Sequence, residues 1–275
     1  MKREGIARIQ TRLESITRRW WFFLLFGLLQ LAPPYVAQGY DRTDAGALTG
    51  AILSRSFEWS TTVLRPFLPI FKVVPLVLIL LVLVLGNRVG RVFSLYVAFN
   101  YVLVALVQSV AVTEGYGLAV LTVNLVMFLL VALFWAWEAL ARATDLSPRK
   151  RPLWRYWVVP FALLAFWYPL HPTTMQPRFR PGDLVTNVAG LTFCMMTPVY
   201  LALMSLYHPR VNRATLRVTG LVGLIIGLYN VLVNFFFEPA TLWWNGILHI
   251  PLLLLSIYGF VLSWISGASR CRAPG

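Results

Sequence analysis

Long apolar runs recur along almost the whole chain, and they constrain its fold more than any other feature. The run at residues 67–86 holds one charged residue, Lys72, and the run at 118–140 holds only Glu138. A helix needs about 20 mainly apolar residues to cross the hydrocarbon core of a bilayer. Runs of this length and purity therefore predict transmembrane helices.

The composition agrees with a membrane environment. Of the 275 residues, 59% are hydrophobic and 12% are charged, whereas soluble domains average about 45–50% apolar and about 25% charged residues. We expect an all-α, polytopic bundle of about eight spans in the cell membrane, with short loops. The predicted spans are residues 20–36, 67–86, 92–112, 118–140, 156–170, 184–207, 218–237 and 244–266.

The chain divides into a basic N-terminal segment at 1–19, a transmembrane domain at 20–266 and a basic tail at 267–275. Ile6, Ile9, Leu13 and Ile16 recur at helical spacing, which predicts an amphipathic helix held at the inner surface by anionic lipid. A solvated tail is the alternative.

The first span and the first loop leave choices open. A signal peptide cleaved after Ala37 is the alternative to a retained span, but the leading basic region is long and Tyr35 stands where cleavage requires a small residue. Residues 48–64, in the longest loop, are expected to form an interfacial or re-entrant helix.

The distribution of basic residues predicts the orientation. Lys and Arg concentrate in cytoplasmic loops. With the N-terminus inside, every Lys and Arg falls on the inner side except Lys72, within a span, and the following five. The outer arginines are Arg42, Arg55, Arg65, Arg178 and Arg180. Both termini are therefore predicted to be cytoplasmic, and inner loops rather than a nucleic-acid partner explain the net charge of +14.

Polar residues inside the predicted spans gather in their outer halves, apart from Asn100 near mid-depth and Glu138 near the inner end. Such residues are costly in a bilayer and tend to face the bundle interior or a wet cavity. This asymmetry predicts a polar pocket open to the outside. The candidate ligand-binding residues are Lys72, Asn187, Asn230, Asn234, Asn245 and His249, with Arg178 and Arg180 at the mouth to attract an anion or a lipid phosphate.

Each candidate also has an explanation without a ligand. The amides are able to bond neighbouring helices as packing contacts, and His249 is able to form one structural hydrogen bond. Lys72 is able to extend to the interface, and the two arginines to anchor headgroups. A capping interaction, or an ion pair with Arg142 one turn later, explains Glu138.

Two polar and small-residue stripes predict a tightly packed helix pair. Glycines and asparagines recur every three or four residues in the span at 218–237, and a matching stripe follows in the next span. Small residues allow close approach of helices in membranes. The stripes are Gly220, Gly223, Gly227, Asn230 and Asn234, and Asn245, His249, Leu252, Ser256, Gly259 and Ser263.

No motif identifies a reaction. The chain lacks Walker, HExxH and GxSxG motifs, and its two cysteines, Cys194 and Cys271, lie in different predicted environments, which predicts no disulfide. We assign no catalytic residue, metal or cofactor. The favoured interpretation is a permease-like protein for a small polar or amphipathic ligand.

Two other classes stay open. One is an enzyme acting on a lipid or lipid-linked substrate at the outer leaflet, with His249 as acid or base and Arg178 and Arg180 on a phosphate. The other is a non-catalytic subunit or assembly factor that binds a membrane-protein partner through its stripes.

Overall fold

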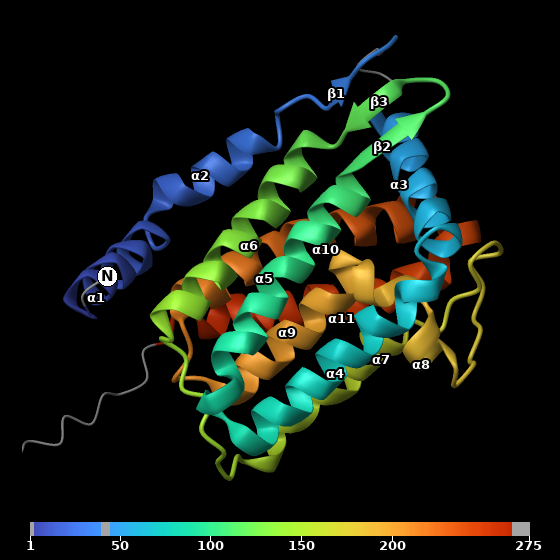
Figure 1. The fold of residues 1–275 in the computed structure, drawn as a ribbon. Coiled ribbons are helices and arrows are strands. Elements are labelled where there is room, and N and C mark those ends of the chain that lie inside the picture. The colour runs from blue at the N-terminus through green and yellow to red at the C-terminus, as the bar shows by residue number, and fades with distance from the viewer. Residues whose placement is uncertain (1–2, 40–44, 266–275) are drawn as a thin grey trace, which may run out of the picture.

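A computed structural model describes residues 3–39 and 45–265, which form a helical bundle with a small sheet at one end (Figure 1). The predicted tail at 267–275 lies outside the described residues, as does Arg42. Five described helices are long and apolar enough to span a membrane, and a bent pair is a sixth candidate. The helical, membrane-type bundle is thus confirmed, whereas eight full-length spanning helices are not.

The long helices follow the apolar runs closely. They are α4 (Leu68–Leu85), which is preceded by the turn η2 (Arg65–Phe67), α5 (Asn87–Ser109), α6 (Thr122–Ala141), α10 (Arg213–Leu232), which continues into the π-turn η5 (Val233–Phe237), and α11 (Pro239–Leu262). The shorter helices are α1 (Arg3–Ile16), α2 (Trp20–Leu29), α3 (Ala45–Thr62), η3 (Leu153–Trp157), α7 (Val158–Trp167), α8 (Asp183–Thr186), η4 (Val188–Leu191) and α9 (Phe193–Tyr207). Helices are therefore confirmed within the segments 1–19 and 48–64.

Three predicted spans are not single long helices. The segment 20–36 is helical only over the 10 residues of α2, and the adjacent Pro33 and Pro34 supply no backbone donor to extend it. The helix α7 also has 10 residues. The span predicted at 184–207 is broken, with a bend of 98° between α8–η4 and α9. The backbone is extended at Asn187 and again at Thr192, which interrupts the helix on both sides of η4.

A three-stranded antiparallel sheet replaces the end of the span predicted at 92–112 and the start of the span predicted at 118–140. Its strands are β1 (Tyr35–Val36), β2 (Val110–Thr113) and β3 (Gly117–Val120), in the order β1-β3-β2. The spans predicted at 92–112 and 118–140 were therefore too long at this end. Leu48 and Ile52 of α3 pack against the sheet. We call this part of the molecule the sheet end.

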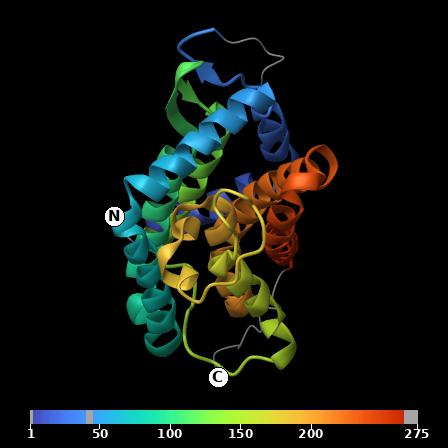
Figure 2. The ribbon, with the colours of Figure 1, turned by 90° about the vertical axis from the view of Figure 1, so that its right-hand side faces the viewer.

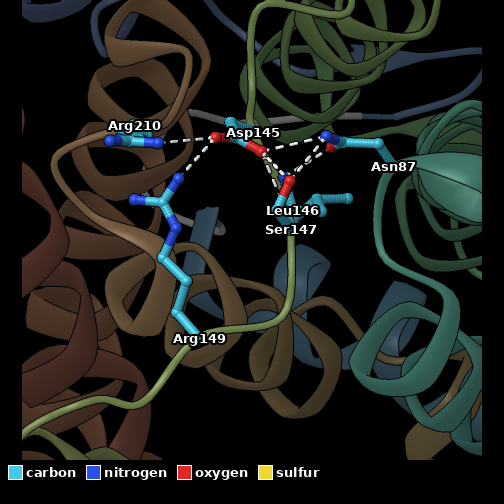
Figure 3. A network of polar contacts seen from close by, with 6 residues as sticks. All are labelled: Asn87, Asp145, Leu146, Ser147, Arg149 and Arg210. Atoms are coloured by element: carbon cyan, nitrogen blue, oxygen red, sulfur yellow. Dashed lines mark hydrogen bonds and ion pairs between the residues drawn. The ribbon is translucent and has the colours of Figure 1, made fainter.

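The opposite end is held by a polar network around Asp145, and we call it the Asp145 end (Figure 3). The Asp145 carboxylate lies 3.0 Å from both Arg149 and Arg210, and it accepts hydrogen bonds from Ser147 and Asn87. These hydrogen bonds, that from Ser147 above all, lower the pKa of Asp145 below its ordinary value. The network joins the start of α5 to the loop after α6 and the loop before α10.

The N-terminal helix α1 is bound to the Asp145 end. Gln10 donates to Asn212 at 2.9 Å, and Asn212 in turn donates to the buried carboxylate of Glu138 at 2.8 Å. Glu138 also accepts from the backbone N–H of Thr144. The predicted ion pair between Glu138 and Arg142 is wrong, because Arg142 ends α6 in a left-handed conformation and makes no ion pair with it.

The two predicted stripes meet, as α10 and α11 pack along their lengths. A Cβ atom added to Gly220 would lie 2.9 Å from the backbone nitrogen of Phe260, and one added to Gly227 would lie 3.2 Å from the Cα atom of Leu253. The backbones approach so closely because these positions carry no side chain.

Candidate functional site

A cleft of about 380 Å³ opens at the sheet end. One wall comes from the end of α3, η2 and the start of α4. The other comes from α8, η4 and the loop after α7, which faces the viewer in Figure 2. The lining residues are Phe57, Thr61, Arg65, Leu68, Tyr168, Leu170, Pro172, Arg178, Arg180, Asp183, Thr186, Asn187 and Val188.

The loop at 169–182 is fixed against the bundle by polar contacts. Arg178 donates to both carboxylate oxygens of the buried Asp183, at 3.0 and 3.2 Å. The indole N–H of Trp167, the last residue of α7, donates to the carbonyl oxygen of Arg180 at 3.0 Å. The loop therefore holds two arginines beside the cleft in a defined conformation.

Positive charge dominates the lining. Arg65, Arg178 and Arg180 face a single carboxylate, that of Asp183. Among the described residues, neither Arg65 nor Arg180 makes an ion pair within 4.0 Å. The Nε atom of Arg178 is buried without a hydrogen-bond partner. The cleft thus offers guanidinium donors that the protein itself does not use.

The break before α9 forms part of the cleft wall, and three amide side chains satisfy its backbone. Asn187 accepts from the backbone N–H two residues later at 3.1 Å. Asn100 donates to the carbonyl oxygen of Gly190, and Gln108 accepts from the backbone N–H of Phe193, both at 2.8 Å. Non-helical backbone at membrane depth requires such partners because lipid supplies none. Some of the amides predicted to lie within the spans therefore form hydrogen bonds with the backbone of this helix break and do not face a ligand.

Lys72 lies near the cleft without lining it. Its side chain is buried, its Nζ donates to the carbonyl oxygen of Phe166, and it lies 3.9 Å from the centre of the Phe166 ring. Asn187 donates to the next two carbonyls, those of Trp167 and Tyr168, at 2.6 and 3.2 Å. The last carbonyls of a helix lack intrahelical partners, and a cation is favourable there. Lys72 therefore caps α7 and does not extend to the interface.

The remaining predicted pocket residues form a separate cluster between α10 and α11. Asn245 donates to Asn234 at 2.8 Å, and Asn234 donates to the carbonyl oxygen of Asn230 at 2.6 Å. The Nδ1 atom of His249 lies 2.7 Å from the carbonyl oxygen of Asn245. The hydroxyl of Tyr168 donates to Asn245 at 3.2 Å, so this tyrosine contacts both the cluster and the cleft.

The structure thus divides the predicted site. Asn187, Arg178 and Arg180 line the cleft, whereas Lys72, Asn230, Asn234, Asn245 and His249 do not. Sequence reasoning missed Arg65 as a lining residue, although it was one of the few arginines assigned to the outer side. It also missed Tyr168, because an aromatic residue at the end of an apolar run resembles any interfacial anchor.

The described lining of the cleft offers donors for an anion. This described lining contains no histidine or cysteine, and the carboxylate of Asp183 is paired with Arg178. No group of three or more His, Cys, Asp or Glu side chains converges elsewhere in residues 3–39 and 45–265. No protein-family model, curated protein or solved structure matches the chain.

Proposed function

We propose that this chain is a permease-like integral membrane protein that takes a small polar or amphipathic ligand into the cleft from outside the cell. One observation carries the proposal: the broken helix formed by α8, η4 and α9 supplies a wall of the cleft. Many transporters bind their substrates at discontinuous helices of this kind. The free guanidinium groups of Arg65 and Arg180 give the cleft a ligand-binding capacity.

The proposed topology has eight crossings, including the one made by the short α2. Gln10 of α1 accepts from Trp137 near the end of α6, and β1 pairs with β3 just before α6 begins. The segment between them therefore runs the length of α6 (Figure 1). The ten residues of α2 rise about 15 Å, and residues 32–36, which follow the turn that closes this helix, add at most about 16 Å. Their sum matches a hydrocarbon core of about 30 Å.

The crossing by η3 and α7 is supported in the same way. Arg151, just before η3, donates to the carbonyl oxygen of Leu206 near the end of α9. At the other end of α7, Trp167 accepts from Asn187 at the cleft. These two contacts lie at opposite ends of the bundle, so the segment between them traverses it.

Charge favours placing the Asp145 end in the cytoplasm, together with both termini. Most described basic residues belong to loops or helix ends on that side, whereas the sheet end carries few. The described arginines of the sheet end are Arg55, Arg65, Arg178 and Arg180. The cleft then opens to the outside of the cell membrane.

The two competing classes receive less support. The enzyme hypothesis requires His249 at the site, but His249 is buried, bonded to Asn245 and outside the cleft lining. The assembly-factor hypothesis requires the polar stripes to face a partner, but they face one another in the α10–α11 pair. Within residues 3–39 and 45–265, no contact favours either class over a ligand-binding cleft.

Cysteine accessibility tests the proposal. Single cysteines replace Arg55, Arg180, Asn187, Asn234 or His249 in a Cys194→Ala, Cys271→Ser background, and intact cells receive a membrane-impermeant maleimide. We expect labelling at 55, 180 and 187, and none at 234 and 249. Labelling at 55 without labelling at 187 would show that the cleft is dry, and would favour the assembly-factor hypothesis.

Inside-out vesicles separate transport from simple binding. Alternating access requires that the site also opens to the cytoplasm, so position 187 should react slowly with the same maleimide from that side. Arg149→Cys provides a control at the Asp145 end, which should react fast in vesicles and not in cells. Absence of any reaction at 187 in vesicles would make the cleft a binding site without transport.

A further inference from the structure

We infer that the ligand of the cleft is an amphiphile whose polar group is a phosphate. This inference rests on the proposed function and specifies its ligand. The lining places the guanidinium groups of Arg65, Arg178 and Arg180 against the single carboxylate of Asp183. The cleft therefore has an excess of two positive charges.

A phosphate monoester matches this excess. It carries about −1.5 to −2 charges at neutral pH and three strong acceptor oxygens. A carboxylate carries one charge, so one guanidinium would stay unpaired. Planar guanidinium groups bind phosphate with paired hydrogen bonds. Arg65 and Arg180 have no ion-pair partner among the described residues, so both have donors available, whereas Arg178 is paired with Asp183.

The other polar groups of the lining do not compete for this role. The amide nitrogen of Asn187 is engaged with the carbonyls that end α7. The hydroxyls of Thr61 and Thr186 donate to the carbonyl oxygens of Phe57 and Gly182 on their own helices or turns. Recognition of the anion therefore falls to the arginines.

The apolar part of the lining indicates the rest of the ligand. Phe57, Leu68, Leu170 and Val188 line the same cleft as the arginines. Leu68 and Val188 belong to a buried apolar cluster that continues into the bundle. The volume of about 380 Å³ falls within the range of small-ligand pockets, roughly 300–1,000 Å³. A phosphate bound at the arginines would leave its organic part against these apolar side chains.

The cleft also lies beside aromatic residues of the kind that mark the headgroup level of a bilayer. Phe179, between the two arginines of the loop, packs edge-on against Trp167 and Trp244, with ring centres 5.6 Å apart in each pair. Tryptophans concentrate at this depth in membrane proteins. A phosphate can reach the cleft at this level as a lipid headgroup from the bilayer or as a free phosphate ester from solution.

Binding of defined phosphates to the purified, full-length protein in dodecyl maltoside tests the inference. The probes are inorganic phosphate, dodecyl phosphate and dodecanoate, each titrated while intrinsic tryptophan fluorescence is recorded, because Trp167 contacts the Arg180 backbone. We expect dodecyl phosphate to bind most tightly. Arg65→Gln and Arg180→Gln should each weaken it by about tenfold or more, as expected for loss of a charge-assisted hydrogen bond. Arg55→Gln is the matched control, since Arg55 pairs with Glu58 and does not line the cleft.

The other possible results identify the source of the phosphate and show whether the phosphate inference or the cleft itself is wrong. Tight binding of inorganic phosphate would support a phosphate site filled from solution, whereas dodecyl phosphate binding alone would support a lipid headgroup. Equal binding of dodecanoate, or unchanged binding in both cleft variants, would overturn the inference. Position 187 would still react with maleimide in that case, so failure of the phosphate inference is separable from failure of the proposed cleft.

Discussion

Gly190 shows how a single residue sets the geometry of the cleft. It lies in η4, where the broken helix crosses α4, and a Cβ atom built on it would overlap the backbone carbonyl of Phe71. The same residue offers its own carbonyl oxygen to Asn100. Only glycine permits this contact, so the wall of the cleft depends on the absence of one methyl group.

Replacement of Gly190 by alanine should therefore destabilise the protein by about 1–3 kcal/mol, the usual cost of overpacking a rigid core. Thermal unfolding in detergent measures the change. Gly182→Ala is the control in the same region, because no atom lies within 4 Å of its added Cβ. Equal unfolding temperatures for the two variants would contradict the close packing of η4 on α4.

The sequence predicted where polar residues enter the membrane but not what they contact. Asn100, Gln108 and Asn187 were recognisable as amides inside apolar runs, yet their partners belong to a helix break that no hydropathy pattern marks. Lys72 was equally visible, and its role as a cap of α7 depends on a helix end 94 residues later in the chain. Such contacts are set by tertiary packing, which a single sequence does not specify.

The pair formed by α10 and α11 is the element for which sequence reasoning was most successful. Small residues at spacings of three and four predicted a face of close approach, and the structure confirms it. Helix ends were predicted less well. The segment at 110–113, rich in β-branched residues, lies within an apolar run, but it pairs with 117–120 in the sheet. The chain turns at 114–116, and Gly117 at the start of β3 adopts a φ of +63°.

Substitution of a glycine between these two helices is expected to destabilise the protein. Gly220→Ala should lower the unfolding temperature, since the added methyl would lie 2.9 Å from the backbone nitrogen of Phe260, and we expect a loss of about 1–3 kcal/mol. Gly27→Ala is the helical control, with no atom within 4 Å of its added Cβ. Because alanine favours helix over glycine, that variant should be neutral or slightly more stable. A stable Gly220→Ala protein would mean that the two helices separate more easily than their contacts indicate.

At the scale of the whole molecule, the network around Asp145 joins three connections of the bundle (Figure 3). Hydrogen bonds from Ser147 and Asn87 favour the ionised carboxylate and lower the pKa of Asp145. A lowered pKa in the folded state means that the ionised form stabilises the fold above the unfolded pKa of about 3.9. This contribution disappears as the pH falls below that value and through the folded pKa.

The stability difference between the protein and its Asp145→Asn variant should therefore be constant above about pH 5 and shrink below about pH 4. Thermal unfolding at a series of pH values, in the same detergent, measures it. Glu58→Gln is the comparison, since its ion pair with Arg55 is exposed and such pairs contribute about 0–1 kcal/mol. A difference that stays constant down to pH 3 would show that the Asp145 charge does not stabilise the fold.

The overall architecture was predictable because apolar runs and basic loops follow from the bilayer itself. The number of membrane crossings was harder to predict, because α2 and α7 are each only 10 residues long. Counting only full-length helices gives five or six candidate spans in the described residues, and the crossing by α2 stays a proposal. The cleft could not be predicted from the sequence, because its arginines come from η2 and from a loop more than 100 residues further along the chain.

The attachment of the N-terminal segment has a consequence for biosynthesis. Residues 3–36 leave the ribosome first, but β1 pairs with β3 at 117–120, and Gln10 bonds Asn212 across 202 positions of the chain. Both anchors of this segment are therefore synthesised long after it. During translation this segment therefore gains its partners in two stages: β3 and Trp137 of α6 are made first, and the contact between Gln10 and Asn212 forms only when α10 begins to emerge.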